Sequence, residues 1–253
     1  MHHKEDISIL IVTHNHEDYI SQLIQSLERF DYRNAFFCDA NSSDNTVNII
    51  ENSNYKKNIL QKKRLEGFSK NNNDIIRHFN LQTKYYLLLN PDLFFDEDFI
   101  VKLFEKMESD PSIGIATPII YYPNKILQNT WKKFPSVWSV LKKRVGITKT
   151  DNQEQVISSN IDWCLGACMM ITNKLMKPNG TLLDERYRLY CEDVDICFEA
   201  KQKKFLVFGV KDTYAYHHLN EMSSKKIFSK YNYWNISSIV KFAFKWKWRY
   251  FVK

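Results

Sequence analysis

The most constraining feature of the sequence is an apolar run that ends abruptly in a polar turn. Residues 85–89 are five consecutive aromatic or aliphatic side chains, the pattern of a strand buried on both faces of a parallel sheet. Pro91 cannot donate a ladder hydrogen bond, so the strand must end before it. The strand therefore delivers Asn90 and Asp92 to the carboxyl edge of a sheet, where open α/β sheets bind ligands. A strand followed by a plain Asn-Pro-Asp turn is the alternative interpretation.

The N-terminal residues repeat this arrangement. Apolar runs predict strands at 7–12 and 35–38, and helical spacing of apolar side chains predicts a helix over 18–30 between them. A strand, a helix and a strand at this spacing favour a right-handed βαβ unit and a parallel sheet. Asp39 then follows its strand as Asp92 follows the later one.

The remaining elements continue the alternation of strands and helices. The predictions are a helix through 47–50 capped by Ser43 or Asp44, a strand near 58–60, helices through 75–79 and 96–108, strands at 113–117, 161–171 and 205–208, and an insertion or long loop facing substrate at 121–160.

Composition narrows the class of protein. The chain has 253 residues, a net charge of +7 and only six glycines and six prolines, which favours one large α/β domain with an anionic partner. Five cysteines without a CxxC pair indicate buried free thiols in a reducing compartment. No signal peptide and no apolar run of about eighteen residues is present, so we expect a cytosolic chain attached to a membrane surface.

Two later clusters carry groups suited to catalysis or metal binding. Glu192, Asp193 and Asp195 follow an aromatic stretch and predict a helix that begins near Glu192. Simple N-terminal capping by these acids is the alternative. His217 and His218 come shortly after the last strand and are ligand candidates, although a lone histidine is usually structural.

The last 29 residues are basic and aromatic. From Lys225 onward there is no acid, and eight lysine or arginine residues alternate with aromatic side chains. Spacing leaves helix and strand both open at 236–250. The composition suits an anionic membrane surface, whereas nucleic acid is disfavoured because only one of the basic residues is arginine.

Five motifs in this order resemble family 2 glycosyltransferases of the GT-A fold, and the resemblance extends from Ser8 to about Phe244. They lie at 11–15, 39–46, 67–73, 88–92 and 191–197. More narrowly, residues 133–135, 162–166 and 190–193 are similar to bacterial O-antigen rhamnosyltransferases.

The resemblance implies a fold and an activity. Residues 1–224 would form a GT-A domain with a mainly parallel sheet, divided into a nucleotide-sugar half at 1–118 and an acceptor and catalytic half at 119–224. Residues 225–253 would be a membrane-associating tail. The expected reaction is inverting transfer of L-rhamnose from dTDP-rhamnose onto a GlcNAc-diphospho-undecaprenol acceptor at the cytoplasmic face of the bacterial inner membrane.

The resemblance also implies residue roles. Asp193 would be the catalytic base, with Glu192 as the fallback. Asp92 and His217 would hold Mg²⁺ or Mn²⁺, although Asn90 stands where the family has the first acid of its motif. The residues implied at the donor nucleotide are Thr13, Asn15, Asp39, Lys70, Asn73 and Asn90, and those implied near the acceptor are Trp163 and His218.

Other functions remain as alternatives. The donor could be another UDP- or dTDP-sugar. A sugar nucleotidyltransferase would need a glycine-rich loop after the first strand, and residues 13–16 contain no glycine. A non-catalytic module that binds membrane or nucleic acid would explain the tail but not the acids at the strand ends.

Overall fold

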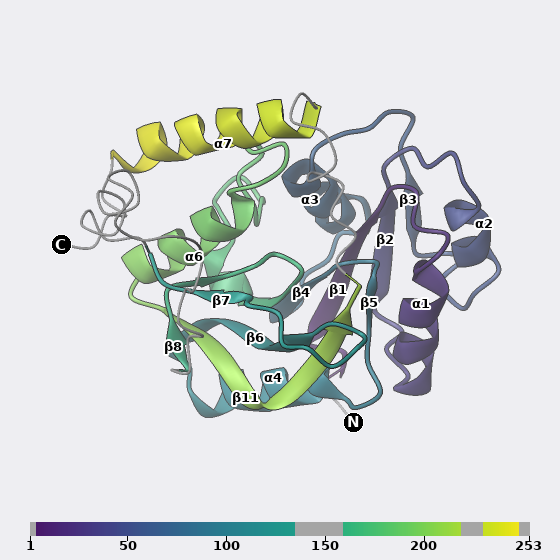
Figure 1. Ribbon diagram of the computed structural model, residues 1–253, viewed down its shortest axis with the longest axis horizontal. Helices are drawn as coiled ribbons and strands as arrows, with labels where there is room; N and C mark the ends of the chain where they lie inside the picture. Colours follow the sequence, from purple (N-terminus) through teal and green to yellow (C-terminus); the bar gives the residue numbers. More distant parts are fainter. Residues whose placement is uncertain (1–3, 135–158, 219–229, 248–253) are drawn as a thin grey trace.

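The computed structural model describes residues 4–134, 159–218 and 230–247 (Figure 1). Most of the predicted insertion, at 135–158, and the tail segments 219–229 and 248–253 lie outside the described residues.

A nine-stranded sheet forms the centre of the domain. Its path runs in the order β3-β2-β1-β4-β10-β6-β11-β5, with β8 paired to β11. Strands β3, β2, β1 and β4 are parallel, β6 and β11 are parallel, and β10 is antiparallel to both of its neighbours. The bounds are β1 Ile7–Thr13, β2 Ala35–Asp39, β3 Ile59–Gln61, β4 Tyr85–Leu89, β5 Leu93–Phe94, β6 Ile113–Tyr121, β8 Asn160–Ile161, β10 Cys168–Thr172 and β11 Leu206–His217.

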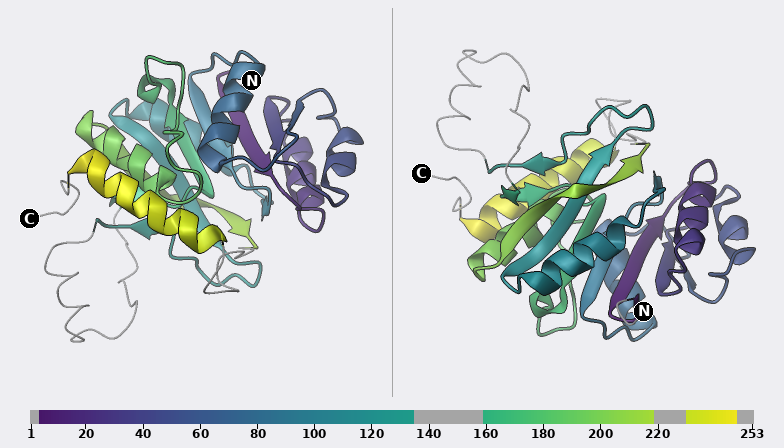
Figure 2. Two further views of the ribbon diagram at one scale, coloured as in Figure 1. Left: turned by 90° about the horizontal axis from the view of Figure 1, so that it is seen from above. Right: turned by 90° about the horizontal axis from the view of Figure 1, so that it is seen from below.

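Helices cover both faces of this sheet because its strands are apolar on both sides. Ile9 and Ile11 point into one core with helices α1, α2 and α4, whereas Leu10 points into a second core with α3 and α6. Helix α7 lies outside α6 (Figure 2). The bounds are α1 Ile20–Arg29, α2 Thr46–Glu51, α3 Phe68–His78, α4 Phe99–Ser109, α6 Glu192–Gln202 and α7 Lys230–Trp246, with a 3₁₀ turn η2 at Asn173–Leu175.

The structure confirms the α/β architecture and corrects several local predictions. The strand predicted at 161–171 consists of parts of three strands, β8, β9 (Trp163–Cys164) and β10. A bend at Asp162 separates β8 from β9, and a turn at Gly166 and Ala167 separates β9 from β10. Strand β9 pairs with β7 (Trp131–Lys132) in a second sheet, and only β10 and β8 join the main one.

The last strand and the C-terminal segment also differ from the prediction. Strand β11 continues from Leu206 to His217, past an irregularity between Val210 and Tyr214, so His217 lies inside the strand. The described part of the tail is helical, which settles the choice between helix and strand. No helix in the described ranges is both long and apolar enough to cross a bilayer.

Two further predictions concern the N-cap of α2 and the state of the cysteines. The N-cap is Asn45, not Ser43 or Asp44, although the Asp44 carboxylate accepts a hydrogen bond from the Thr46 amide at 3.0 Å. All five cysteines are free thiols, as predicted, and only Cys191 is not fully buried.

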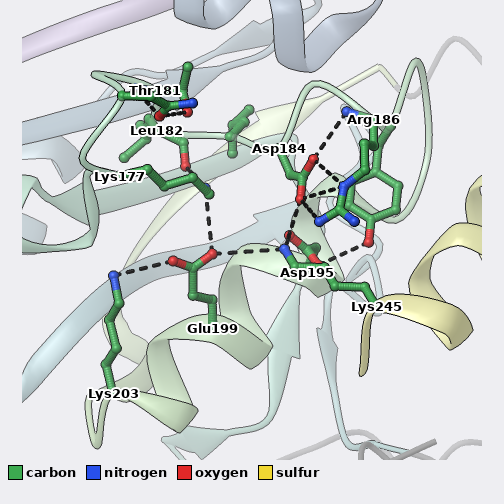
Figure 3. A network of polar contacts seen from close by, with 12 residues as sticks. Lys177, Thr181, Leu182, Asp184, Arg186, Asp195, Glu199, Lys203 and Lys245 are labelled. Atoms are coloured by element: carbon green, nitrogen blue, oxygen red, sulfur yellow. Dashed lines mark hydrogen bonds and ion pairs between the residues drawn. The ribbon is translucent and has the colours of Figure 1, made fainter. Parts of the chain in front are cut away.

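A buried charge cluster attaches α7 to α6. The Lys245 ammonium lies 2.6 Å from Asp195 and 2.9 Å from Asp184 (Figure 3). The Trp246 indole N–H donates to Asp195 at 2.7 Å. The hydroxyl of Tyr187 donates to the same carboxylate at 3.0 Å. Asp195 is only 1% exposed. Its charge is therefore held by α7, not by solvent.

We expect Lys245→Met to lower the free energy of unfolding by about 3 kcal/mol at pH 7, because it leaves the Asp195 carboxylate buried without its cation. Burial already raises the pKa of Asp195. Protonation removes the unpaired charge, so the loss should shrink as the pH falls.

Urea unfolding of both proteins at pH 5 and pH 7 measures the effect. Lys203→Met is the matched control, since Lys203 forms only a half-exposed pair with Glu199 and should cost less than about 0.5 kcal/mol. Equal losses in the two variants would contradict the role of Lys245.

Candidate active site

A pocket of about 340 Å³ opens at the carboxyl edge of the sheet. It lies beyond the ends of β1 and β4, between the first turns of α3 and α6, and is closed on one side by Trp234 of α7. Its wall includes Thr13, His14, His16, Asn71, Asn90, Gly166, Arg188, Leu189, Tyr190, Glu192, Asp193 and His217. Five of the sequence-predicted site residues thus meet in one cavity.

Two backbone amides donate to Asp193 and favour its charged form. Its Oδ2 accepts a hydrogen bond from the Gly166 amide at 3.1 Å, and its Oδ1 accepts one from the Val194 amide at 2.8 Å. Burial nevertheless raises the pKa of Asp193. A carboxylate with a raised pKa in a pocket is a competent general base, because it takes up a proton more readily than an exposed one.

Glu192 beside it has less hydrogen-bond support. The side chain is 8% exposed, and its Oε2 has no hydrogen-bond partner among the described residues. Burial and the neighbouring Asp193 raise the pKa of Glu192 to about 8. At neutral pH Glu192 is therefore mostly protonated, and the two amide donors favour the charged form of Asp193.

The backbone that presents these acids is unusual. Tyr190 and Cys191 both have left-handed conformations, with φ of 67° and 68°, directly before α6. Such conformations cost free energy in residues with a side chain, so the surrounding structure must impose them. Two consecutive left-handed residues turn the chain sharply from the pocket rim into the helix that carries Glu192 and Asp193.

Asp92 and His217 form a second polar pair at this edge. The Asp92 Oδ1 and His217 Nε2 atoms are 3.1 Å apart, and both side chains are buried. Gln128 fixes the imidazole: its amide N–H₂ donates to the His217 carbonyl at 2.6 Å, so its oxygen faces Nδ1 at 3.1 Å and accepts from it. The other ring nitrogen, Nε2, therefore faces Asp92 Oδ1.

This pair fits a divalent cation in its chemistry. Carboxylate oxygens are ligands suited to Mn²⁺ or Mg²⁺, and an imidazole nitrogen is a common metal ligand that can complete such a site. Within the described ranges, no three histidine, cysteine or acidic side chains converge as a metal site. The protein would therefore supply two ligands, near the Asn90 amide, and the diphosphate of a bound nucleotide the rest.

Asp39 and Asn15 organise the loops around Thr13. The Thr13 hydroxyl donates to Asp39 Oδ1 at 2.9 Å, and the Ser42 amide donates to Asp39 Oδ2 at 2.8 Å. Asn15 is exposed and accepts a hydrogen bond from the Ser43 amide at 2.8 Å. Thr13 reaches the pocket wall, and Asp39 and Asn15 position the loop beside it.

Besides Asn15, Asp39 and Asp92, four predicted site residues lie away from the pocket wall. The Lys70 ammonium pairs with Asp74 at 2.6 Å, and Asn73 is fully buried against the backbone of residues 182 and 183. Trp163 packs between two apolar clusters, and the His218 imidazole contacts Gln22 at 2.8 Å.

The geometry of helix α3 explains why Asn71, and not the predicted Asn73, faces the pocket. Asn71 and Asn73 are two residues apart on α3, which places their side chains on nearly opposite sides of the helix. Asn71 lines the pocket, and its buried Oδ1 has no hydrogen-bond partner in the described part of the chain. The motif at 67–73 was the right signal, but the residue within it that faces the cavity is Asn71.

Other pocket residues gave little signal in the sequence. His14, whose Nδ1 is likewise buried without a hydrogen-bond partner among the described residues, and Arg188 both line the cavity. Gln128 comes from the stretch predicted as an insertion. Gly67 has a steric role beside residues 184–190, the loop at the pocket rim (the rim loop). A Cβ at Gly67 would lie 2.7 Å from the Arg188 carbonyl oxygen, so only glycine lets the rim loop approach α3.

We expect Glu192→Gln to stabilise the protein at high pH. A carboxyl whose pKa is raised from about 4.5 to about 8 by folding binds its proton more tightly in the folded state, so its contribution to stability is lost as the pH rises through that interval. The variant should therefore lose about 3 kcal/mol less than wild type between pH 5 and pH 9.

Urea unfolding across this pH range measures the difference, with the exposed Glu105→Gln as control. Parallel pH profiles of wild type and Glu192→Gln would contradict the protonated state of Glu192.

Comparison with known proteins gives the family and the fold. The family described as "Glycosyl transferase family 2" matches residues 8–177. The rhamnosyltransferase WbbL of Escherichia coli (strain K12) is 26% identical over 259 residues, which cover 93% of this chain and 92% of that protein.

Solved glycosyltransferases share the fold at low identity. GalNAc-T7 with UDP, GalNAc and Mn²⁺ has a TM-score of 0.69 and 15% identity, and covers 96% of this chain. The mannosyltransferase PcManGT of Pyrobaculum calidifontis, with GDP-Man and Mn²⁺, has a TM-score of 0.64 and 13% identity, and covers 95% of this chain. This chain spans 48% and 63% of those two chains.

The family match extends over most of the chain, and the strand ends and the acids of α6 form one pocket within the same fold. The chain is a glycosyltransferase and belongs to glycosyl transferase family 2.

Proposed function

We propose that the enzyme is an inverting rhamnosyltransferase. It would move L-rhamnose from dTDP-rhamnose to a hydroxyl of a GlcNAc-diphospho-undecaprenol-type acceptor at the cytoplasmic face of the bacterial inner membrane. The observation that carries the transfer chemistry is the shared pocket: Asp193, held by two backbone amides, and His217, paired with Asp92, line the same cavity.

Similarity to a rhamnosyltransferase along nearly the whole chain supports the choice of sugar. A different UDP- or dTDP-sugar is the alternative donor. Nucleic acid is not a partner in this proposal, because the tail has a single arginine and the pocket holds acids. The proposed division places donor binding in residues 1–118 and acceptor binding and catalysis in 119–224.

The proposed mechanism uses the difference between the two acids. Asp193 removes the proton from the acceptor hydroxyl while the hydroxyl oxygen attacks the anomeric carbon and the bond to the diphosphate breaks. Glu192, which already bears a proton, cannot compete as base at neutral pH and adds no second negative charge beside the acceptor. The negative charge of the Glu192–Asp193 pair would thus lie on the Asp193 carboxylate, which must receive the proton.

The other edge of the pocket would hold the donor. Asp92 and His217 would bind Mg²⁺ or Mn²⁺, which stabilises the negative charge of the departing nucleoside diphosphate. Thr13, supported by Asp39, and the unpartnered Oδ1 of Asn71 would bind donor hydroxyls or the base. Arg188 at the rim supplies a cation near the leaving group.

A donor screen with wild type and Asp193→Asn tests the proposal. With a GlcNAc-diphospholipid acceptor, we expect product from dTDP-rhamnose and little from UDP- or GDP-sugars. Asp193→Asn should bind dTDP normally but lose about 10²–10⁴-fold in kcat, because the amide cannot take up the proton. If only another nucleotide sugar supports transfer, that sugar is the donor and the rhamnose assignment is wrong. Full activity of Asp193→Asn would exclude Asp193 as the base.

We expect Asp92→Asn and His217→Ala to weaken both the affinity for Mn²⁺ with dTDP and the turnover, by at least about tenfold. Calorimetric titration of Mn²⁺ in the presence of dTDP, and turnover with and without EDTA, are the measurements. His78→Ala serves as control, since His78 is exposed at the end of α3. Unchanged Mn²⁺ affinity in both site variants would place the cation elsewhere.

A further inference from the structure

The outward side of α7 is the most apolar exposed surface in the described part of the chain. Six large hydrophobic side chains in the described ranges are strongly exposed, and five of them belong to this helix. They are Tyr233 at 71%, Ile236 at 64%, Ile239 at 52%, Val240 at 47% and Phe244 at 80%. Tyr233, Ile236, Val240 and Phe244 follow helical spacing and form one stripe. Soluble domains rarely leave such a stripe facing water.

The inward side of the same helix is fully engaged. The Ser238 hydroxyl donates to the Leu189 carbonyl at 2.9 Å, and Phe242 is buried in an apolar cluster with Phe198. Lys245 and Trp246 hold the Asp195 carboxylate. Because these contacts fix the rotation of α7, the stripe cannot turn into this domain's own core. The stripe stays strongly exposed in the described part of the structure.

The charges on this side of α7 are of one sign. Helix α7 contains no acid, and the lysines at 241 and 247 are exposed beside the stripe. No acid occurs anywhere from Lys225 to the C-terminus. An antiparallel pair of such helices from two copies would bring lysines against lysines. An anionic surface instead complements both the stripe and its basic flanks.

We propose that the outward face of α7 docks on an anionic lipid bilayer, with the helix lying in the plane of the interface. The helix is about 26 Å long and amphipathic, which suits a position along the surface. The stripe enters the boundary between headgroups and acyl chains, and the exposed Lys247 at the end of α7 contacts anionic headgroups.

Docking in this way would place the pocket at the membrane surface. Trp234, in the first turns of α7, lines the pocket, and the Arg188 guanidinium lies 4.3 Å from its ring centroid. The Lys241 ammonium donates to the Arg186 carbonyl at 2.9 Å, so the rim loop is tied to the same helix. Only this consequence, access for a lipid-linked acceptor, rests on the proposed function.

Vesicle flotation of the full chain tests the docking. Wild type should float with phosphatidylglycerol–phosphatidylcholine vesicles, less with pure phosphatidylcholine, and less at 0.5 M NaCl. The double variant Ile236→Ser/Phe244→Ser should partition at least about tenfold more weakly, because it removes two apolar side chains from the stripe. Ile126→Ser is the matched control, since Ile126 is 59% exposed but lies in another part of the fold.

Two further measurements separate the alternatives. Because both substitutions are at exposed positions, thermal unfolding should be unchanged. Transfer to a water-soluble GlcNAc-diphosphate acceptor should also be unchanged, while transfer to the same acceptor in vesicles falls. Flotation of the double variant equal to wild type, or a wild-type dimer that these substitutions dissociate, would overturn the proposal. Failure of transfer from every donor would instead reject the proposed function and leave the flotation result standing.

Discussion

Parallel pairing of β1 with β2 and β4 is the constraint on which the site depends. The register sets Thr13 opposite Asp39, and the end of β4 lies beside the end of β1. Because parallel strands end at the same edge of a sheet, the strand order itself brings together the polar residues that follow them. Apolar burial on both faces of the sheet, by α1 and α4 on one side and α3 and α6 on the other, stabilises this register.

The catalytic half reaches the same edge by a different route. Strand β10 enters antiparallel between β4 and β6, and the turn before it places the Gly166 amide against Asp193. Two left-handed residues then aim the start of α6 into the pocket. Burying two adjacent carboxyls there is costly, and the structure reduces the cost by giving backbone donors to one and a proton to the other.

Helix α7 connects this chemistry to the outside of the molecule. Its inward side neutralises Asp195, two residues after Asp193, and its first turns contribute Trp234 to the pocket. Because α7 is firmly attached to the domain, the direction of its outward apolar stripe would determine how the whole domain is oriented on a docking surface. Under the proposed docking, the rotation of α7 would set the position of the active site relative to the membrane.

The sequence by itself determined most of the main strands and the edge where they end, because apolar runs, Pro91 and the acids after the strands are local patterns. Five motifs in order carried the resemblance to the family. The sequence predicted Asp193, Glu192, Thr13, Asn90 and His217, all of which line one pocket. Only the tertiary structure decided which side chain of a motif faces the cavity, as with Asn71 and Asn73, because helix rotation depends on packing. Likewise, Gln128, Arg188 and Trp234 reach the site through contacts between distant segments, and such contacts leave no local pattern in the chain.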